Sequence, residues 1–214
     1  MLDMLLRARD PEGGTPFSAR DVRDQAATMI LAGHETTALT IFWCLVLLAQ
    51  SAPWQDAVAA EAATAGEAPE ADALPLARAV VDESLRLYPP AFAVVRMARE
   101  PVEVAGVALR RGDAVMVAPW VLHRHRELWD APGRFDPRRF LAPAPPPDRF
   151  SFLPFGAGPR VCIGAQFAVT EAVLALSAIL GRFRVSLASP RPVLPVAVVT
   201  TMPDHLPLFR VERR

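Results

Sequence analysis

The sequence predicts a mainly α-helical protein with small β-sheets, the α+β class. Two long stretches, residues 19–50 and 163–180, have the apolar content and the capping residues of helices. Between them, residues 92–118 contain short runs rich in β-branched side chains, separated by turn residues. Hydrophobic residues make up 52% of the 214 residues, so the chain can bury a sizeable core and form one large domain or part of one.

The first half of the chain is expected to be helical. Ser18 is a favourable N-cap for a long helix that is polar at its start and nearly all apolar at its end, as in a helix that enters a core. The stretch before it, DPEGGTPFS, has the composition of a turn. Pro89 and Pro90 end the last helix of this half, because proline lacks the amide hydrogen that a helix needs. The helices expected here cover residues 1–9, 19–50, 53–64 and 74–87, with a loop over 65–73.

After Pro90 the pattern changes to short strands and loops, with one more long helix. That helix is expected over residues 163–180, closed by Gly181. Residues 119–151 are rich in proline and arginine and are expected to be irregular. The short strands expected in this half cover residues 92–98, 102–104, 114–118, 184–187, 196–201 and 208–211.

Composition and charge exclude several classes of protein. The 23 basic residues, all of them arginine, balance 23 acidic residues, which argues against a nucleic-acid-binding surface. Two cysteines are too few for a small secreted disulfide scaffold, so the expected location is cytoplasmic. The N-terminus does not have the pattern of a signal peptide, and the longest apolar stretch, within residues 38–49, is too short to cross a bilayer. No membrane segment is therefore expected in this chain.

One cysteine lies in a loop whose neighbours suit a thiolate that binds haem iron. In FLPFGAGPRVCIGAQFA, Gly158 and Gly164 on either side of Cys162 let the backbone approach a flat macrocycle. Arg160 supplies a cation for a haem propionate, and Phe155 can pack beside the sulfur and exclude water. The positive end of the helix that follows would stabilise the thiolate. The alternative is a buried structural thiol at the start of a helix.

The pattern F-x-x-G-x-R-x-C-x-G over residues 155–164 resembles the haem-binding signature of the cytochrome P450 family. The resemblance implies a b-type haem with Cys162 as its metal ligand, and a fold that corresponds to the C-terminal portion of this family, from its I helix to the C-terminus. Cys44 has no such neighbours and is expected to be an ordinary core residue.

A second resemblance concerns residues that would support the cysteine loop. Glu83 and Arg86 form E-x-x-R, a spacing that puts both side chains on one face of a helix. By itself the spacing favours a weak ion pair on the surface. However, DESLRLYPP resembles the K helix of the family and FDPRRF its later F-x-P-x-R-F segment. The resemblance implies a buried structural cluster of Glu83, Arg86 and Arg139 that holds the cysteine loop in place.

The middle of the long helix, AGHETT, resembles the oxygen-activation segment of the family's I helix. Ala32 and Thr36 are four residues apart and share one face of the helix. The resemblance implies that Ala32 is a cofactor-binding residue, because its small side chain leaves room over a flat cofactor. The resemblance implies that Thr36 and Glu35 are the catalytic residues, with the hydroxyl binding dioxygen or water and the acid relaying protons. The alternatives are a hydrogen bond from Thr36 to the carbonyl four residues earlier and an exposed charge at Glu35. His34 falls at a variable position of the motif and is not expected to bind a metal.

Two further features are interpreted through the same family. Arg96, in the first strand-like run, matches an arginine or histidine that contacts a haem propionate. His123 and His125 resemble the segment that follows the short strands. Their alternation might suggest a zinc pair, but no third and fourth ligands stand at suitable spacing.

The resemblance implies a monooxygenase that inserts one oxygen atom from O2 into a small apolar organic substrate. Electrons would come from a ferredoxin or a flavoprotein reductase, since no flavin or nicotinamide motif occurs in the chain.

Members of the family are about twice as long, so residues 1–214 are interpreted as a partial haem domain whose N-terminal half is absent. A fragment of a longer protein is the favoured explanation. The alternative is a truncated, non-catalytic remnant that still binds haem. A hydrolase is excluded because no nucleophile elbow is present.

Overall fold

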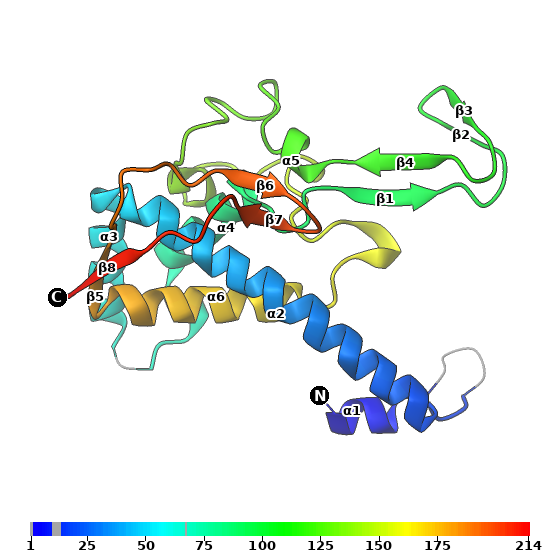
Figure 1. Cartoon of the computed structure of the whole chain (residues 1–214), viewed down its shortest axis with the longest axis horizontal. Coiled ribbons are helices and arrows are strands. Elements are labelled where there is room, and N and C mark those ends of the chain that lie inside the picture. Colours follow the sequence, from blue (N-terminus) through cyan, green and yellow to red (C-terminus); the bar gives the residue numbers. More distant parts are fainter. Residues whose placement is uncertain (1, 10–13, 67) are drawn as a thin grey trace.

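Three packed helices form the centre of the structure. The computed structural model describes residues 2–9, 14–66 and 68–214. Helices α2 (Ala19–Ala49), α4 (Pro75–Leu87) and α6 (Ala165–Leu180) contact one another, and Figure 1 shows α2 crossing the whole molecule as a long diagonal rod. Their facing side chains bury one continuous apolar cluster. The α+β class predicted from the sequence is confirmed, and this helical core supports the loops on which the candidate site lies.

Helix α2 begins at the residue that the sequence indicates. The Ser18 hydroxyl accepts a hydrogen bond from the Asp21 amide at 3.2 Å, and the Asp21 carboxylate accepts one from the Ser18 amide at 3.0 Å. This reciprocal capping box satisfies two amide groups that the first turn leaves without partners. The C-terminal half of α2 is buried, with Trp43 and Cys44 fully enclosed. Cys44 is therefore a core residue, as expected, and burial raises the pKa of its thiol to about 12.

Apart from α3, the remaining helices have at most six residues. The stretch expected to be a loop over 65–73 ends in one turn of 3₁₀-helix, and the irregular stretch 119–151 contains two further short helices. The turn before Ser18 lies partly outside the described residues. These helices are α1 (Leu2–Arg7), α3 (Ala52–Ala65), α5 (Pro119–Leu122), η1 (Ala71–Ala73), η2 (Pro137–Phe140) and η3 (Gly158–Arg160).

The strands of the described part of the chain pair into four antiparallel two-stranded sheets. Residues 196–201, expected to be one strand, contain a turn that separates β6 from β7, and β3 was not expected. Sheet β5–β8 joins the end of α6 to the C-terminus, and β6–β7 lies over α2 (Figure 1). The pairs are β1 (Val94–Met97) with β4 (Ala114–Val117), β2 (Val102–Val104) with β3 (Val107–Leu109), β5 (Phe183–Leu187) with β8 (Phe209–Arg213), and β6 (Pro195–Ala197) with β7 (Thr201–Pro203).

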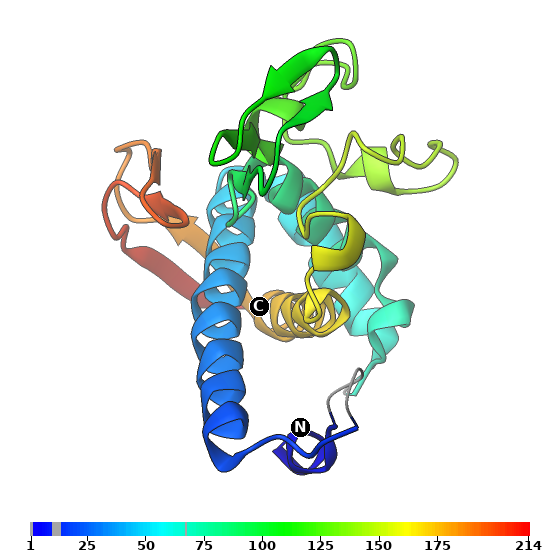
Figure 2. The ribbon, with the colours of Figure 1, turned by 90° about the vertical axis from the view of Figure 1, so that its right-hand side faces the viewer.

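Apolar side chains are exposed in several parts of the structure, among them α2 and the β1–β4 sheet. Ile30 and Leu31 in the N-terminal half of α2 are 64% and 76% exposed, and the β1–β4 sheet exposes Met97 and Met116. Figure 2 shows this half of α2 extending beyond the helical core toward α1. By length and composition α2 would be able to span a membrane, but core helices of soluble proteins share these properties. The C-terminal half of α2 packs into the helical core.

Candidate functional site

The cysteine loop, residues 152–164, holds Cys162 at the surface. The Cys162 amide donates a hydrogen bond to the Phe155 carbonyl at 3.0 Å, which closes the loop just before α6. Phe155 packs against the core cluster and thereby anchors the start of the loop. The thiol of Cys162 is free and exposed, between Val161 and Ile163, which are 53% and 90% exposed. An exposed thiol within an apolar surround is unusual for a structural cysteine, so the buried alternative does not apply to Cys162.

Helix α6 begins two residues later than the sequence suggests. Its first residue is Ala165 and its N-cap is Gly164, whereas the expected start is at Ile163. The difference arises because the short η3 turn and the 155–162 hydrogen bond set the chain direction as far as Cys162. A side chain at Gly164 would place its Cβ 3.9 Å from the Cys162 sulfur, so the backbone there lies close to the thiol.

The residues expected around a haem fit such a group. Gly158 has a φ of +75°, and no atom lies within 4 Å of the position that a Cβ would occupy, so the loop is open on this side. Arg160 and Arg96 are exposed, and neither forms an ion pair with any residue that the structure describes. Arg96, on β1, donates only to the neighbouring Val95 carbonyl at 2.9 Å. A free thiol, an open glycine face and two unpaired guanidinium groups suit an apolar, iron-containing ligand with anionic substituents.

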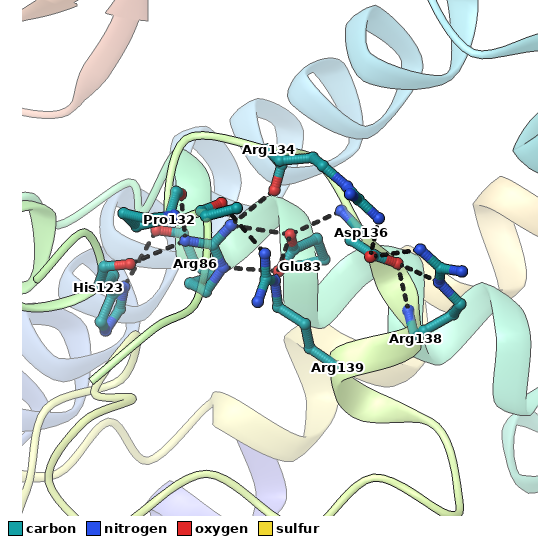
Figure 3. Close-up of polar contacts among 9 residues, drawn as sticks. Glu83, Arg86, His123, Pro132, Arg134, Asp136, Arg138 and Arg139 are labelled. Carbon is teal, nitrogen blue, oxygen red and sulfur yellow. Dashed lines mark hydrogen bonds and ion pairs between the residues drawn. The ribbon is translucent and has the colours of Figure 1, made fainter. Parts of the chain in front are cut away.

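A buried ion pair lies on α4 (Figure 3). The Arg86 guanidinium donates to both carboxylate oxygens of Glu83 at 2.6 and 2.8 Å, and both side chains are fully buried. Arg86 also donates to three backbone carbonyls at 2.7–3.1 Å, which satisfies its remaining hydrogen-bonding capacity. These carbonyls belong to His123, Pro132 and Arg134. The arrangement is a buried network and not the weak surface pair that the spacing alone also allowed.

Arg139 joins this network from η2. Its Nε lies 3.4 Å from Glu83 Oε1, within ion-pair distance but without the alignment of a hydrogen bond, and its terminal nitrogen donates to the Ala131 carbonyl at 3.2 Å. The Asp136 amide donates to the same Glu83 oxygen at 2.8 Å. The structure therefore brings Glu83, Arg86 and Arg139 together.

Hydrogen bonding to Arg138 is the main reason that the pKa of the Asp136 carboxyl falls to about 2.

The sequence links His123 to a family segment but does not predict its place in this network. It is fully buried, whereas His125 is exposed, so the two histidines do not converge on one point. The His123 ring contacts the Arg86 carbonyl through Nδ1 at 3.2 Å and accepts a hydrogen bond from the Leu153 amide through Nε2 at 2.8 Å. Burial lowers the pKa of His123 to about 4. No local pattern marks this role, because both partners are at least 30 residues away in the sequence.

On α2 the hydroxyl of Thr36 donates a hydrogen bond to the Ala32 carbonyl at 2.7 Å. This bond to the carbonyl four residues earlier is the structural alternative to a catalytic role that the sequence left open. The oxygen lone pairs of Thr36 stay available to accept hydrogen bonds. Glu35 is not merely an exposed charge, since its carboxylate accepts a short hydrogen bond from the Thr200 hydroxyl in the β6–β7 turn. Ala32 is exposed on the helix surface, as is His34.

Comparison with known proteins agrees with this geometry. A model of the cytochrome P450 family matches residues 1–205. Cyclooctatin synthase of Streptomyces melanosporofaciens is 42% identical over 190 residues, covering 86% of this chain and 41% of that protein. Pentalenene oxygenase of Streptomyces avermitilis is 38% identical over 211 residues, covering 94% of this chain and 46% of the relative. A crystal structure of the cytochrome P450 CYP102L1 superposes with a TM-score of 0.87 and 30% identity, covering all of this chain and 50% of the solved one. The chain thus spans half the length, or less, of these proteins.

Proposed function

The chain belongs to the cytochrome P450 family, and from this premise we propose that residues 1–214 are a partial haem domain of a monooxygenase. The reaction would transfer one oxygen atom from O2 to an apolar organic substrate. The observation that carries the proposal is the exposed thiol of Cys162 in a loop supported by the buried Glu83–Arg86 network. A surface-accessible thiolate on a rigid loop is the protein ligand that such an iron cofactor requires.

The residues of this chain would each contribute binding or orientation. Cys162 would bind the iron, while Arg160 and Arg96 would bind the propionates through charge-assisted hydrogen bonds. Phe155 would exclude water from the sulfur side, because it packs between the loop and the core. The haem supplies the redox chemistry that activates dioxygen when it is bound. Glycines 158 and 164 keep side chains away from the approach to the thiol.

Thr36 and Glu35, on α2, would handle protons during the reaction. Thr36 would accept or redirect a hydrogen bond at the oxygen-binding position, and Glu35 would move protons inward from solvent. The hydrogen bond from Thr200 fixes the Glu35 carboxylate against the β6–β7 turn, which restricts its orientation. The electron donor would be a ferredoxin or a flavoprotein reductase. The location would be cytoplasmic.

The relatives also suggest which substrates to test. Two of them are named pentalenene oxygenase and cyclooctat-9-en-7-ol 5-monooxygenase, names that denote an unsaturated hydrocarbon and an unsaturated alcohol. The haem-loaded protein, supplied with a ferredoxin system and isotopically labelled O2, is expected to produce a compound carrying one labelled oxygen atom. Label that appears only when water is the labelled reagent would contradict oxygen transfer from O2.

Replacing Thr36 with alanine is expected to lower the rate of product formation at least about tenfold, because general acid–base contributions of single side chains are typically larger than this. Thr28 provides a matched control, since its hydroxyl donates to the carbonyl four residues earlier in the same helix at 2.8 Å. Thr28→Ala therefore reports the loss of such a bond alone, and Thr36→Ser should restore the rate. Equal effects of Thr28→Ala and Thr36→Ala in a product assay would assign Thr36 a purely structural role.

The second candidate function is a non-catalytic haem-binding module. The observation that favours it is the exposed apolar surface of α2 and of β1–β4, which indicates that a substrate pocket is incomplete in this chain by itself. The two functions differ in a simple way. A module would bind haem with a thiolate-type spectrum and yield no labelled product with any substrate, whereas the monooxygenase would show both.

A further inference from the structure

His123 connects two parts of the structure that are distant in the sequence. Its ring is fully buried between α4 and the cysteine loop, with the Phe152 ring at a centroid distance of 5.3 Å. On one side Nδ1 faces the Arg86 carbonyl, and on the other Nε2 faces the Leu153 amide. The backbone carbonyl of His123 in turn accepts from the Arg86 guanidinium at 2.8 Å. His123 therefore contacts the buried ion-pair network with both its ring and its backbone.

These partners determine the protonation state of the ring. A carbonyl oxygen can only accept a hydrogen bond, so the Nδ1 that faces Arg86 must carry a hydrogen. A backbone amide can only donate, so the Nε2 that faces Leu153 must present its lone pair. Only the neutral Nδ1–H form of the ring satisfies both contacts. A second proton on Nε2 would bring two donors together at the Leu153 amide and break that hydrogen bond.

We propose that His123 is a positioning residue that holds the cysteine loop on the Glu83–Arg86 network, and that protonation of its ring releases the loop. The proposal rests on the proposed haem-thiolate function for its consequence at Cys162. Leu153 lies near the start of the loop that the 155–162 hydrogen bond closes, so loss of its anchor frees the segment that presents the thiol. The thiolate ligation of haem is thereby sensitive to acid.

The charges around the ring agree with this assignment. The cationic Arg86 and Arg124 face His123 from α4 and from its own segment, and the Glu83 carboxylate next to Arg86 is already paired with that arginine. Burial is the main cause that lowers the pKa of His123 from 6.5 to about 4, with a smaller contribution from these cations. Because the pKa in the folded state is the lower one, the contribution of His123 to stability is complete above about pH 6.5 and is lost as the pH falls toward about 4.

Glutamine provides a sharp test, because its amide has an NH2 group that donates and a carbonyl oxygen that accepts, so it can replace both contacts of the neutral imidazole, but it does not titrate. The thiolate-type Soret band of the reduced, carbon monoxide-treated holoprotein is measured from pH 7 to pH 4. We expect the band of the unchanged protein to be lost in acid, the His123→Gln band to persist to a lower pH, and His123→Leu to lose most of the band already at pH 7. His125→Gln, at an exposed neighbouring histidine, should behave as the unchanged protein does.

A second measurement does not depend on haem. Hydrogen–deuterium exchange at the Leu153 amide should rise at least about tenfold in His123→Leu and stay low in His123→Gln, while amides in the middle of α6 remain protected. Identical acid midpoints for the unchanged and His123→Gln proteins, or an unchanged Leu153 exchange in His123→Leu, would overturn the proposal. If the unchanged protein has no thiolate band but shows the expected exchange pattern, the haem-thiolate function fails and the anchoring role of His123 stands.

Discussion

Replacing Cys162 with alanine is expected to abolish the thiolate-type Soret band of the reduced, carbon monoxide-treated protein. The reason is that the sulfur would be the only iron ligand that the loop supplies, and an alanine side chain has no lone pair to replace it. In the described part of the chain, no group of three His, Cys, Asp or Glu side chains is placed to hold a metal ion, so no other cluster is available to take over. The fold should remain, since Cys162 is exposed and makes its loop contact through the backbone.

Cys44→Ala is the matched control for this experiment. Cys44 is fully buried in the apolar core between α2 and α4, and its raised pKa of about 12 keeps the thiol protonated. Its replacement should leave the band intact and lower the free energy of unfolding by about 1 kcal/mol through the loss of packing. A band that survives in Cys162→Ala, or one that disappears in Cys44→Ala while the fold persists, would show that the ligand has been assigned to the wrong cysteine.

The largest effect on stability is expected from the buried ion pair. Arg86→Leu should lower the free energy of unfolding by about 4 kcal/mol, because it leaves the Glu83 carboxylate buried without its partner. It also deprives three backbone carbonyls of their donor, and each unsatisfied buried group adds to the cost. Denaturant unfolding followed by far-UV circular dichroism measures the change as a shift of the midpoint at constant slope.

Two comparisons make this prediction specific. Arg7→Leu removes an arginine from an exposed pair with Asp3, 3.0 Å apart, and should change the stability by less than about 0.5 kcal/mol. Glu83→Gln keeps an acceptor for the Asp136 amide but removes the charge that Arg86 needs, so it should cost nearly as much as Arg86→Leu. A loss of less than about 1 kcal/mol in both variants at the buried pair would mean that the network is dispensable for the fold.

Much of the helical framework follows from local patterns in the sequence. Ser18 with Asp21 marks the start of α2 because a capping box involves only neighbouring residues. The prolines at 89 and 90 mark the end of α4 for a similarly local reason. In contrast, the start of α6 at Ala165 depends on a hydrogen bond across the cysteine loop, and the turn within 196–201 depends on contacts to α2 and to Pro90. Local propensity does not contain this information.

In the candidate site, too, the sequence predicts what depends on local spacing and misses what depends on distant contacts. The motif spacing identifies Cys162 and the E-x-x-R pair, because these residue types are required at fixed offsets. The spacing does not reveal that Glu35 is held by Thr200, 165 residues away, or that His123 supports Leu153. Each of these contacts is made by one side chain to a distant segment. No local spacing therefore indicates which partner Glu35 or His123 will meet in the folded protein.

The hydrogen bonds that join α2 and α3 to the last strands form late in synthesis, because their partners lie far apart in the sequence. The Trp43 indole donates to the Thr201 carbonyl at 2.9 Å, and the Gln55 amide exchanges hydrogen bonds with Val185 at 2.8 and 3.0 Å. A ribosome that has made α2 must add more than 100 further residues before these partners exist. The apolar end of α2 can pack against α4 early in synthesis, but its contacts with the last strands form only late, and until then that face is open to non-native association.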